Sequence, residues 1–179
     1  MIKKVFLVLL VCALPRLAQA GSQWTLEQST LTYHISHPLH EADGVTHAAR
    51  GKGICQGGEC NFLVAAPVKT FDTGNSNRDL HMLEAVRGGE FPMVSVRFRL
   101  PQSELTSATI YADLEIQFAG KTADYHQVPF KRQAKGSEIQ VMGIIPMKLS
   151  DFNIKPPSLL DMPIKNDVPV RVDTLWREQ

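Results

Sequence analysis

A short polar cluster near the middle of the chain combines side chains that could bind an anion or transfer a proton. Arg78, Asp79 and His81 lie within four consecutive positions. Arginine binds anionic oxygen groups strongly, and histidine changes its charge close to neutral pH. The same residues also fit the first turn of a helix, where Asp79 would interact favourably with the helix dipole and Arg78 would pair with a loop carboxylate. Both interpretations, a polar binding mouth and a structural helix start, are kept open.

Four of the six histidines lie close together in the sequence: His34, His37, His40 and His47. On an extended strand, His34 and His37 would point to opposite faces, so they could share a metal ion only if the chain bent. The spacing of the four matches no established set of metal ligands. We expect no metal site, and a metal-binding accessory role is the least favoured of the functions considered.

The sequence lacks the patterns by which common enzyme classes are recognised. It contains no nucleophile elbow, no glycine-rich phosphate loop and no pair of carboxylates in a recognisable catalytic setting. Its 19 lysines and arginines are interspersed with 18 acidic residues, whereas a nucleic-acid-binding protein usually has a basic stripe. We therefore expect a protein that is not an enzyme, has no resident cofactor and does not bind nucleic acid.

The first twenty residues have the composition of an export signal. Two lysines precede an apolar run at 5–14, and Ala18-Gln19-Ala20 supplies small residues at a cleavage point. The run is too short to cross a bilayer, and no later segment reaches the roughly 20 apolar residues of a spanning helix. We expect residues 1–20 to be a signal peptide, residues 21–179 to form one domain, and the exported protein to lie in a bacterial periplasm without spanning the membrane.

Two cysteines remain after such a cleavage, Cys55 and Cys60, and four residues including Gly57-Gly58 separate them. Thiols oxidise in the periplasm, and two glycines suit the tip of a β-hairpin, so a disulfide across the hairpin is expected. A metal site or a redox-active dithiol would be typical of paired CxxC spacing, which is absent here. A ring this short restricts the unfolded chain little, so the bridge would mainly fix the strand register.

Apolar and polar residues alternate with a period of two through most of residues 21–179, which predicts strands half buried in a sheet or barrel. The clearest strand is 110–118, where Ile110, Leu114 and Phe118 share one face. Further strands are expected at 31–37, 61–68, 94–100, 125–130, 138–146 and 168–176. The residues expected to face inward are Phe62, Val64, Val96, Phe98, Leu114, Ile116, Phe118 and Val141.

Only one stretch, near residues 77–87, favours a helix. Ser76 and Asp79 have the spacing of a capping box, apolar residues follow at helical spacing, and Gly88-Gly89 would end the helix. Many strands with one short helix predict an all-β protein, either an antiparallel barrel or a sandwich.

The block from Ala66 to Phe98 resembles the YceI family. It contains a Thr73-Gly74-Asn75 turn, the Arg78-Asp79-Leu80-His81 helix start, and Phe91-Pro92 ahead of a strand, as members of that family do. The strand 29–37 that ends in a histidine, the turn at 120–122 and the segment 143–154 extend the resemblance over nearly all of residues 21–179.

This resemblance implies an antiparallel lipocalin-like β-barrel of about eight strands that holds an apolar ligand, an isoprenoid-like lipid or a quinone, in its interior. The inward residues named above would then contact the ligand, and Arg78, Asp79 and His81 would lie at the barrel mouth. The same apolar residues would also suit a solid core. A filled barrel acting as a periplasmic interaction or stress-related module, with no carrier role, therefore remains the alternative.

Overall fold

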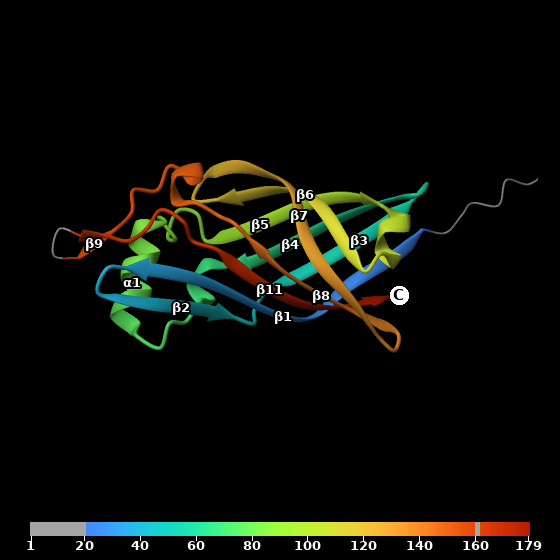
Figure 1. Cartoon of the computed structure of the whole chain (residues 1–179), viewed down its shortest axis with the longest axis horizontal. Coiled ribbons are helices and arrows are strands. Elements are labelled where there is room, and N and C mark those ends of the chain that lie inside the picture. The colour runs from blue at the N-terminus through green and yellow to red at the C-terminus, as the bar shows by residue number, and fades with distance from the viewer. Residues whose placement is uncertain (1–20, 160–161) are drawn as a thin grey trace, which may run out of the picture.

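The computed structural model describes residues 21–159 and 162–179, and it is an antiparallel β-barrel with one α-helix at one end (Figure 1). The signal peptide expected at residues 1–20 lies outside the described residues. The strands are β1 (Ser22–His37), β2 (His40–Thr46), β3 (Arg50–Gln56), β4 (Glu59–Pro67), β5 (Met93–Pro101), β6 (Thr109–Phe118), β7 (Lys121–Lys135), β8 (Glu138–Ile145), β9 (Ser158–Leu159), β10 (Met162–Pro163) and β11 (Val170–Glu178). The helices are α1 (Ser76–Ala85) and the short 3-10 helices η1 (Val68–Thr70), η2 (Gln102–Thr106) and η3 (Leu149–Phe152).

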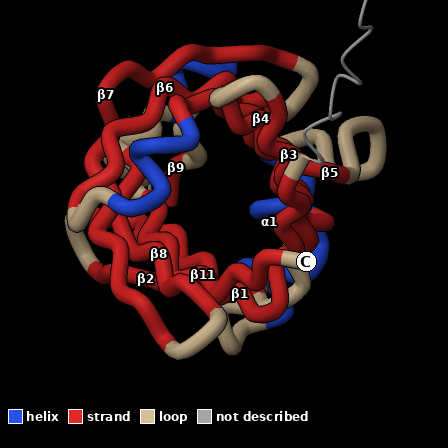
Figure 2. The backbone as a smooth tube through the Cα atoms, turned by 90° about the vertical axis from the view of Figure 1, so that its right-hand side faces the viewer, coloured by secondary structure: helices blue, strands red, loops and turns tan. Residues whose placement is uncertain are grey.

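The 16-residue strand β1 closes the barrel. Its first edge pairs with β11 from Trp24 to Tyr33. Its second edge pairs with β3 near the start of the strand and with β2 towards its end. Strands β3 to β8 follow one another in chain order, and β8 pairs with β11. Eight strands, β1, β3 to β8 and β11, therefore form the ring in Figure 2, and β2 is added beside the second half of β1.

The free edge of β2 is tied to the loop that precedes α1. Val45 and Asp72 exchange two backbone hydrogen bonds, both of 2.9 Å. Helix α1 follows this bridge and lies at the same end of the barrel as the β1–β2 turn (Figure 1). Within the described part of the chain, no helix combines the length and the apolar character that crossing a membrane requires.

The disulfide expected between Cys55 and Cys60 is present, and the two residues form a cross-strand pair of the β3–β4 hairpin. Gly57 and Gly58 have φ angles of 62° and 86°, which glycine adopts without steric cost. Both cysteines are buried, together with Trp24, Leu105 and Trp176, in an apolar cluster at the barrel end opposite α1.

The helix begins as predicted, but the expected capping box is wrong. The N-cap is Asn75 instead of Ser76, and its side chain accepts a hydrogen bond of 3.1 Å from the Arg78 amide. The Asp79 carboxylate accepts from the amide and hydroxyl of Thr73, at 3.1 and 2.6 Å. The Thr73-Gly74-Asn75 turn thus places the asparagine at the cap, where a side-chain oxygen satisfies a free amide.

Candidate functional site

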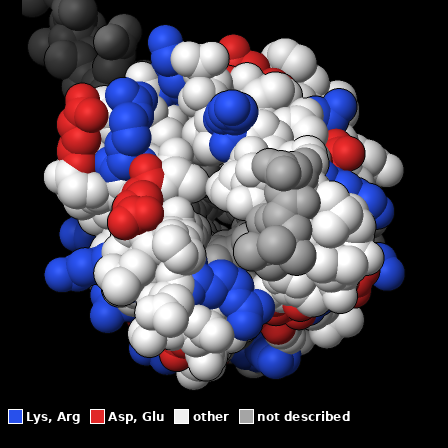
Figure 3. Space-filling model, turned by 90° about the vertical axis from the view of Figure 1, so that its left-hand side faces the viewer, with Lys and Arg blue, Asp and Glu red and all other residues white. Residues whose placement is uncertain are grey.

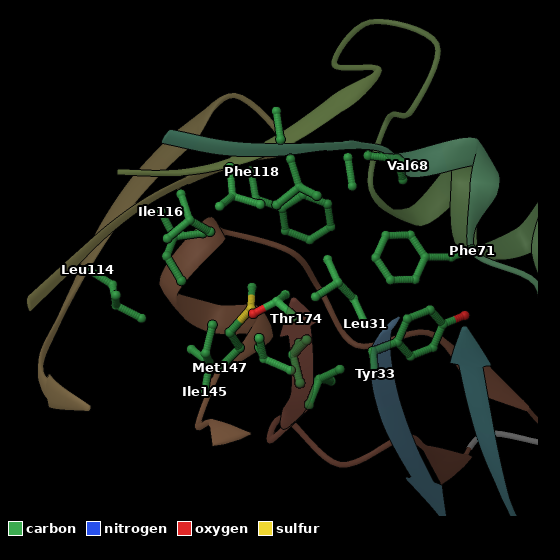
Figure 4. A pocket seen from close by; sticks show the side chains of 18 of the residues that line it. Leu31, Tyr33, Val68, Phe71, Leu114, Ile116, Phe118, Ile145, Met147 and Thr174 are labelled. Carbon is green, nitrogen blue, oxygen red and sulfur yellow. The ribbon is translucent and has the colours of Figure 1, made fainter. Parts of the chain in front are cut away.

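The barrel encloses a cavity of about 320 Å³. This volume lies at the lower end of the range of about 300 to 1,000 Å³ that is typical of small-molecule sites. Side chains from β1, β2, β4 to β8, β11 and α1 form its wall, and Figure 4 shows part of it. Almost all of them are apolar; among the described residues, the polar members of the wall are Tyr33, His40, Arg78, His81 and Thr174.

All eight residues expected to face inward line this cavity: Phe62, Val64, Val96, Phe98, Leu114, Ile116, Phe118 and Val141. Their alternation with exposed residues is clear on β6, where Leu114 and Ile116 are buried and Asp113 and Glu115 are exposed. That the eight residues contact a ligand stays a prediction.

The interior of the barrel is not filled. Val96, Phe98 and Val141 face inward from central strands, yet they are only half-buried. Because these side chains point away from the outer surface, their remaining accessible area faces the cavity. A solid core would bury them completely. The premise of a filled barrel is therefore wrong for this chain.

The wall also contains residues that were not singled out from the sequence. Some of them lie on strands that the alternating pattern predicted, and others lie in connecting segments that face the cavity in the folded protein. They include Leu31, Tyr33, Phe71, Val94, Ile145, Met147, Val170, Val172 and Thr174. The alternation in the expected strands 31–37 and 168–176 does put Leu31 and Tyr33, and Val170, on one face of their strands, whereas Phe71 and Met147 lie outside the strands.

The two ends of the cavity differ. At the disulfide end, Trp24, Leu105 and Trp176 are between 5 and 8% exposed and fill the barrel. The indole of Trp176 donates to the Thr174 hydroxyl at 3.2 Å, and that hydroxyl donates to the Val141 carbonyl at 3.1 Å, so these polar groups are satisfied. At the other end of the barrel, where α1 and the β1–β2 hairpin lie (Figure 1), the surface has a hollow, which is visible in Figure 3. We call this end the mouth, and Arg78, His81 and His40 line the cavity there.

The three residues expected at the mouth have different roles. Arg78 and His81 line the cavity, and Asp79 does not. Asp79 is held by Thr73, as described above, so it belongs to the structure of the helix start. Arg78 is the one lysine or arginine of the described cavity wall, and no described carboxylate forms an ion pair with its guanidinium. A purely structural role predicted that Arg78 would pair with a loop carboxylate. No such pair is found among the described residues.

Tyr33 adds a buried polar group beside the mouth. The residue is 8% exposed, and its hydroxyl is buried without a hydrogen-bond partner among the described residues. Its ring lies 5.5 Å from that of Phe71, and Figure 4 shows the two side by side in the cavity wall. Burial, the largest cause, and the charge of Asp79 together raise the pKa of Tyr33 to about 12, while the charge of Arg78 opposes the rise. The α1 side chains therefore lie close enough to act on this hydroxyl.

Three of the four clustered histidines make separate hydrogen bonds, and the ring of the fourth, His40, lies 4.9 Å from that of His37. His34 contacts Asp43 at 2.8 Å on the outside of the barrel. The buried ring of His37 contacts the Met162 carbonyl at 3.0 Å and accepts from the Leu39 amide at 3.1 Å. His47 contacts the Ser29 carbonyl at 3.1 Å. In residues 21–159 and 162–179, no three histidine, cysteine or acidic side chains are grouped as a metal site requires.

No protein-family model and no curated protein sequence matches the chain. Solved structures match its fold. A polyisoprenoid-binding domain from Saccharophagus degradans, described as implicated in plant cell wall breakdown, has a TM-score of 0.73 at 15% identity, over 87% of this chain and 98% of that one. BcnA from Burkholderia cenocepacia has a TM-score of 0.69 at 13% identity, over 82% of this chain and 95% of that one. A mutant YceI protein from Campylobacter jejuni with a monobromobimane guest has a TM-score of 0.55 at 14% identity, over 66% and 72% of the two chains. The barrel therefore has the fold of YceI proteins and of a polyisoprenoid-binding domain.

Proposed function

We propose that this protein is an exported, YceI-type carrier that binds an isoprenoid-like lipid or a quinone inside its barrel and holds it in the periplasm. The observation that carries the proposal is the open cavity with an almost wholly apolar wall. A polar ligand would lose its hydrogen bonds with water on entering such a space, whereas an apolar chain would gain free energy. The polyisoprenoid-binding domain from Saccharophagus degradans, which has the same fold, supports this ligand class.

The energy of burial is sufficient for such a role. Each buried methylene contributes about 0.8 kcal/mol, so a tail of roughly ten carbons would contribute about 8 kcal/mol before the cost of ordering the ligand. The cavity wall offers shape and apolar contact, and its described polar groups do not form a nucleophile paired with a base. We therefore propose storage or transfer of the ligand, without a chemical reaction on it.

The position of Arg78 suggests how the ligand is oriented. The apolar tail would lie inside the barrel, and the polar end would remain at the mouth beside Arg78 and His81. A guanidinium is well suited to an oxygen-rich polar group at such a boundary.

The proposal is tested with protein purified after export from its own host. Native mass spectrometry, followed by solvent extraction, is expected to detect an apolar mass bound one to one. The extracted protein is then titrated with farnesol, and tryptophan fluorescence follows binding because Trp176 lines the cavity. A protein that carries no lipid and gives no saturable response to farnesol would contradict a carrier role.

A further inference from the structure

The cavity is closed at the disulfide end by side chains alone. Figure 2 faces this end of the molecule, where the backbone of the strands forms a ring around its centre. The rings of Phe62 on β4 and Phe98 on β5 stack with their centroids 4.9 Å apart, and the ring of Trp176 on β11 meets that of Phe62 nearly at right angles, at 5.4 Å. Leu105, from η2, lines the cavity beside them. We call Phe62, Phe98, Trp176 and Leu105 the floor.

The floor spans the barrel because the strands between β11 and β4 leave room for its rings. A Cβ atom at Gly51 of β3 would meet the Trp176 ring, and one at Gly53 would overlap the Phe62 ring. The indole of Trp176 is also fixed by its hydrogen bond to Thr174. The rings therefore cannot move aside without unpacking the buried cluster that contains the disulfide.

The open space begins directly above the floor. Val96, the next inward residue towards the mouth from Phe98 on β5, is only half-buried, whereas Phe62 and Trp176 are 7 and 5% exposed. On the far side of the floor lies Trp24, which is buried and does not line the cavity. The cavity therefore ends at these rings and does not continue to the disulfide.

The depth of the cavity limits the length of a tail that it can bury. A methylene group takes up about as much space as a water molecule, whose share of liquid volume is about 30 Å³, so a cavity of about 320 Å³ holds roughly ten carbons. With the polar end of the ligand at the mouth, the end of its tail would point towards the floor. The remainder of a longer tail would stay outside in water and would gain no further free energy from burial.

We infer that the floor sets the length of the ligand, so that the barrel takes short isoprenoids of about two to three isoprene units and does not enclose longer tails. The inference rests on the proposed carrier function and deepens it, because it names the members of the isoprenoid class that the cavity accepts. Phe62 is the residue that determines the depth, since its ring contacts both other rings of the floor.

The experiment measures the affinity of the exported, solvent-extracted protein for geraniol, farnesol and geranylgeraniol, each of which is one isoprene unit longer than the one before. Isothermal titration calorimetry is used with cyclodextrin complexes, and each dissociation constant is corrected for the measured affinity of the same prenol for cyclodextrin. The variant Phe62→Ala removes the central ring of the floor.

Phe118→Ala is the matched control. Phe118 also lines the cavity and also contacts another ring, that of Phe152 at 5.5 Å. It lies at the opposite end from the floor, beside the β6–β7 turn, where the Ala119 carbonyl accepts a hydrogen bond from Arg87 just beyond α1. Its loss enlarges the cavity without opening the floor.

We expect the wild type to bind farnesol at least about tenfold more tightly than geraniol, because more carbons are buried, and to bind geranylgeraniol no more tightly than farnesol. Phe62→Ala should bind geranylgeraniol at least about fivefold more tightly than farnesol, whereas Phe118→Ala should keep the order of the wild type. The inference would be overturned by a wild type whose affinity rises tenfold again from farnesol to geranylgeraniol. A folded Phe62→Ala protein with the wild-type order, or an equal change of order in the control, would overturn it as well.

Circular dichroism checks the fold of each variant. If Phe62→Ala does not fold, Phe98→Ala takes its place, because the Phe98 ring is only half-buried and its loss removes less packing. The series of three prenols on the wild type needs no variant and decides the inference by itself. A protein that binds none of the three would instead count against the carrier function.

Discussion

The ring of Tyr33 on β1 occupies the space in front of Gly44, its cross-strand partner on β2. A Cβ atom at position 44 would overlap the ring and its hydroxyl oxygen. Glycine is thus required here by the neighbouring aromatic side chain. This contact holds the Tyr33 ring in the cavity wall beside the mouth.

Replacing Gly44 with alanine is therefore expected to displace the Tyr33 ring. Overpacking of this kind lowers the free energy of unfolding by about 1 to 3 kcal/mol. Urea denaturation measures the loss. Gly89→Ala is the matched control, because no atom lies within 4 Å of a Cβ built there. Equal stability of the two variants would show that the ring does not depend on Gly44.

Removal of the Tyr33 hydroxyl should have the opposite effect on stability. The hydroxyl is buried without a described partner, so Tyr33→Phe removes an unsatisfied group and is expected to leave the free energy of unfolding unchanged or raise it by up to about 1 kcal/mol. Tyr125→Phe is the comparison, because the Tyr125 hydroxyl donates to Asp151 at 2.6 Å and its loss should destabilise the protein. If Tyr33→Phe cost as much as Tyr125→Phe, the Tyr33 hydroxyl would have to be hydrogen-bonded in solution.

The raised pKa of Tyr33 predicts a loss of stability in alkaline solution. The folded state keeps the phenol protonated to about pH 12, because burial disfavours the phenolate, whereas the unfolded chain releases the proton near the ordinary tyrosine pKa of 10.0. The contribution of Tyr33 to the free energy of unfolding is therefore complete below pH 10. It declines by about 2 to 3 kcal/mol as the pH rises towards 12. Unfolding experiments across this range should show a steeper decline for the wild type than for Tyr33→Phe. If the free energies of unfolding of the two proteins fell in parallel with pH, the pKa of Tyr33 would not be raised in the folded protein.

The strands that line the cavity could be predicted from the sequence because one face of each meets an apolar space and the other meets water. On β6, Ile110 and Leu114 point inward, and Asp113 and Glu115 point outward. A period of two is the direct result of that boundary. The inward face of the barrel therefore leaves its pattern in the sequence, whether the space behind it is empty or filled.

Strands β2 and β3 lack this pattern for a physical reason. Their inward positions include Gly44 on β2, and Gly51 and Gly53 on β3. At each of these glycines the space for a side chain is taken by an aromatic ring from elsewhere in the barrel, with Phe62 in front of Gly53 and Trp176 in front of Gly51. The side chain that covers each of these glycine positions therefore comes from another strand. The alternation of residue types within β2 or β3 alone does not reveal that these positions face inward.

Arg78, Asp79 and His81 stood out in the sequence because they combine charge with a possible acid-base group, and only the family resemblance placed them at a mouth. Arg78 and His81 line the cavity, and their position there depends on how α1 sits against the β1–β2 hairpin. Asn75 took the cap position that Ser76 was expected to hold, because the preceding turn sets the angle at which the chain enters the helix. The position of α1 at the opening and the choice of N-cap both depend on contacts or turns outside the helix itself. The residue pattern within the helix does not reveal them.

Filling the cavity should abolish ligand binding while the fold is kept. Val96 and Val172 line the cavity and are half-buried, so Val96→Phe/Val172→Phe places two rings in space that is now open. We expect the affinity for farnesol to fall at least tenfold, measured by tryptophan fluorescence. Leu63→Phe is the control, because Leu63 is 44% exposed on the outer face of β4. Unchanged farnesol binding in the double variant, with a circular dichroism spectrum like that of the wild type, would place the ligand outside the barrel.

Substitution of Arg78 tests whether the mouth holds the polar end of the ligand. Arg78→Gln keeps a polar, shorter side chain and removes the positive charge that lines the cavity beside α1. We expect the affinity for farnesyl phosphate to fall about tenfold, which corresponds to about 1.4 kcal/mol, and that for farnesol to change little, because only the phosphate carries charge. Arg97→Gln is the control, since Arg97 pairs with Glu115 on the outer wall at 3.2 Å. An equal loss for both ligands would mean that Arg78 supports the fold of the mouth, and an unchanged preference between them would mean that the polar end lies elsewhere.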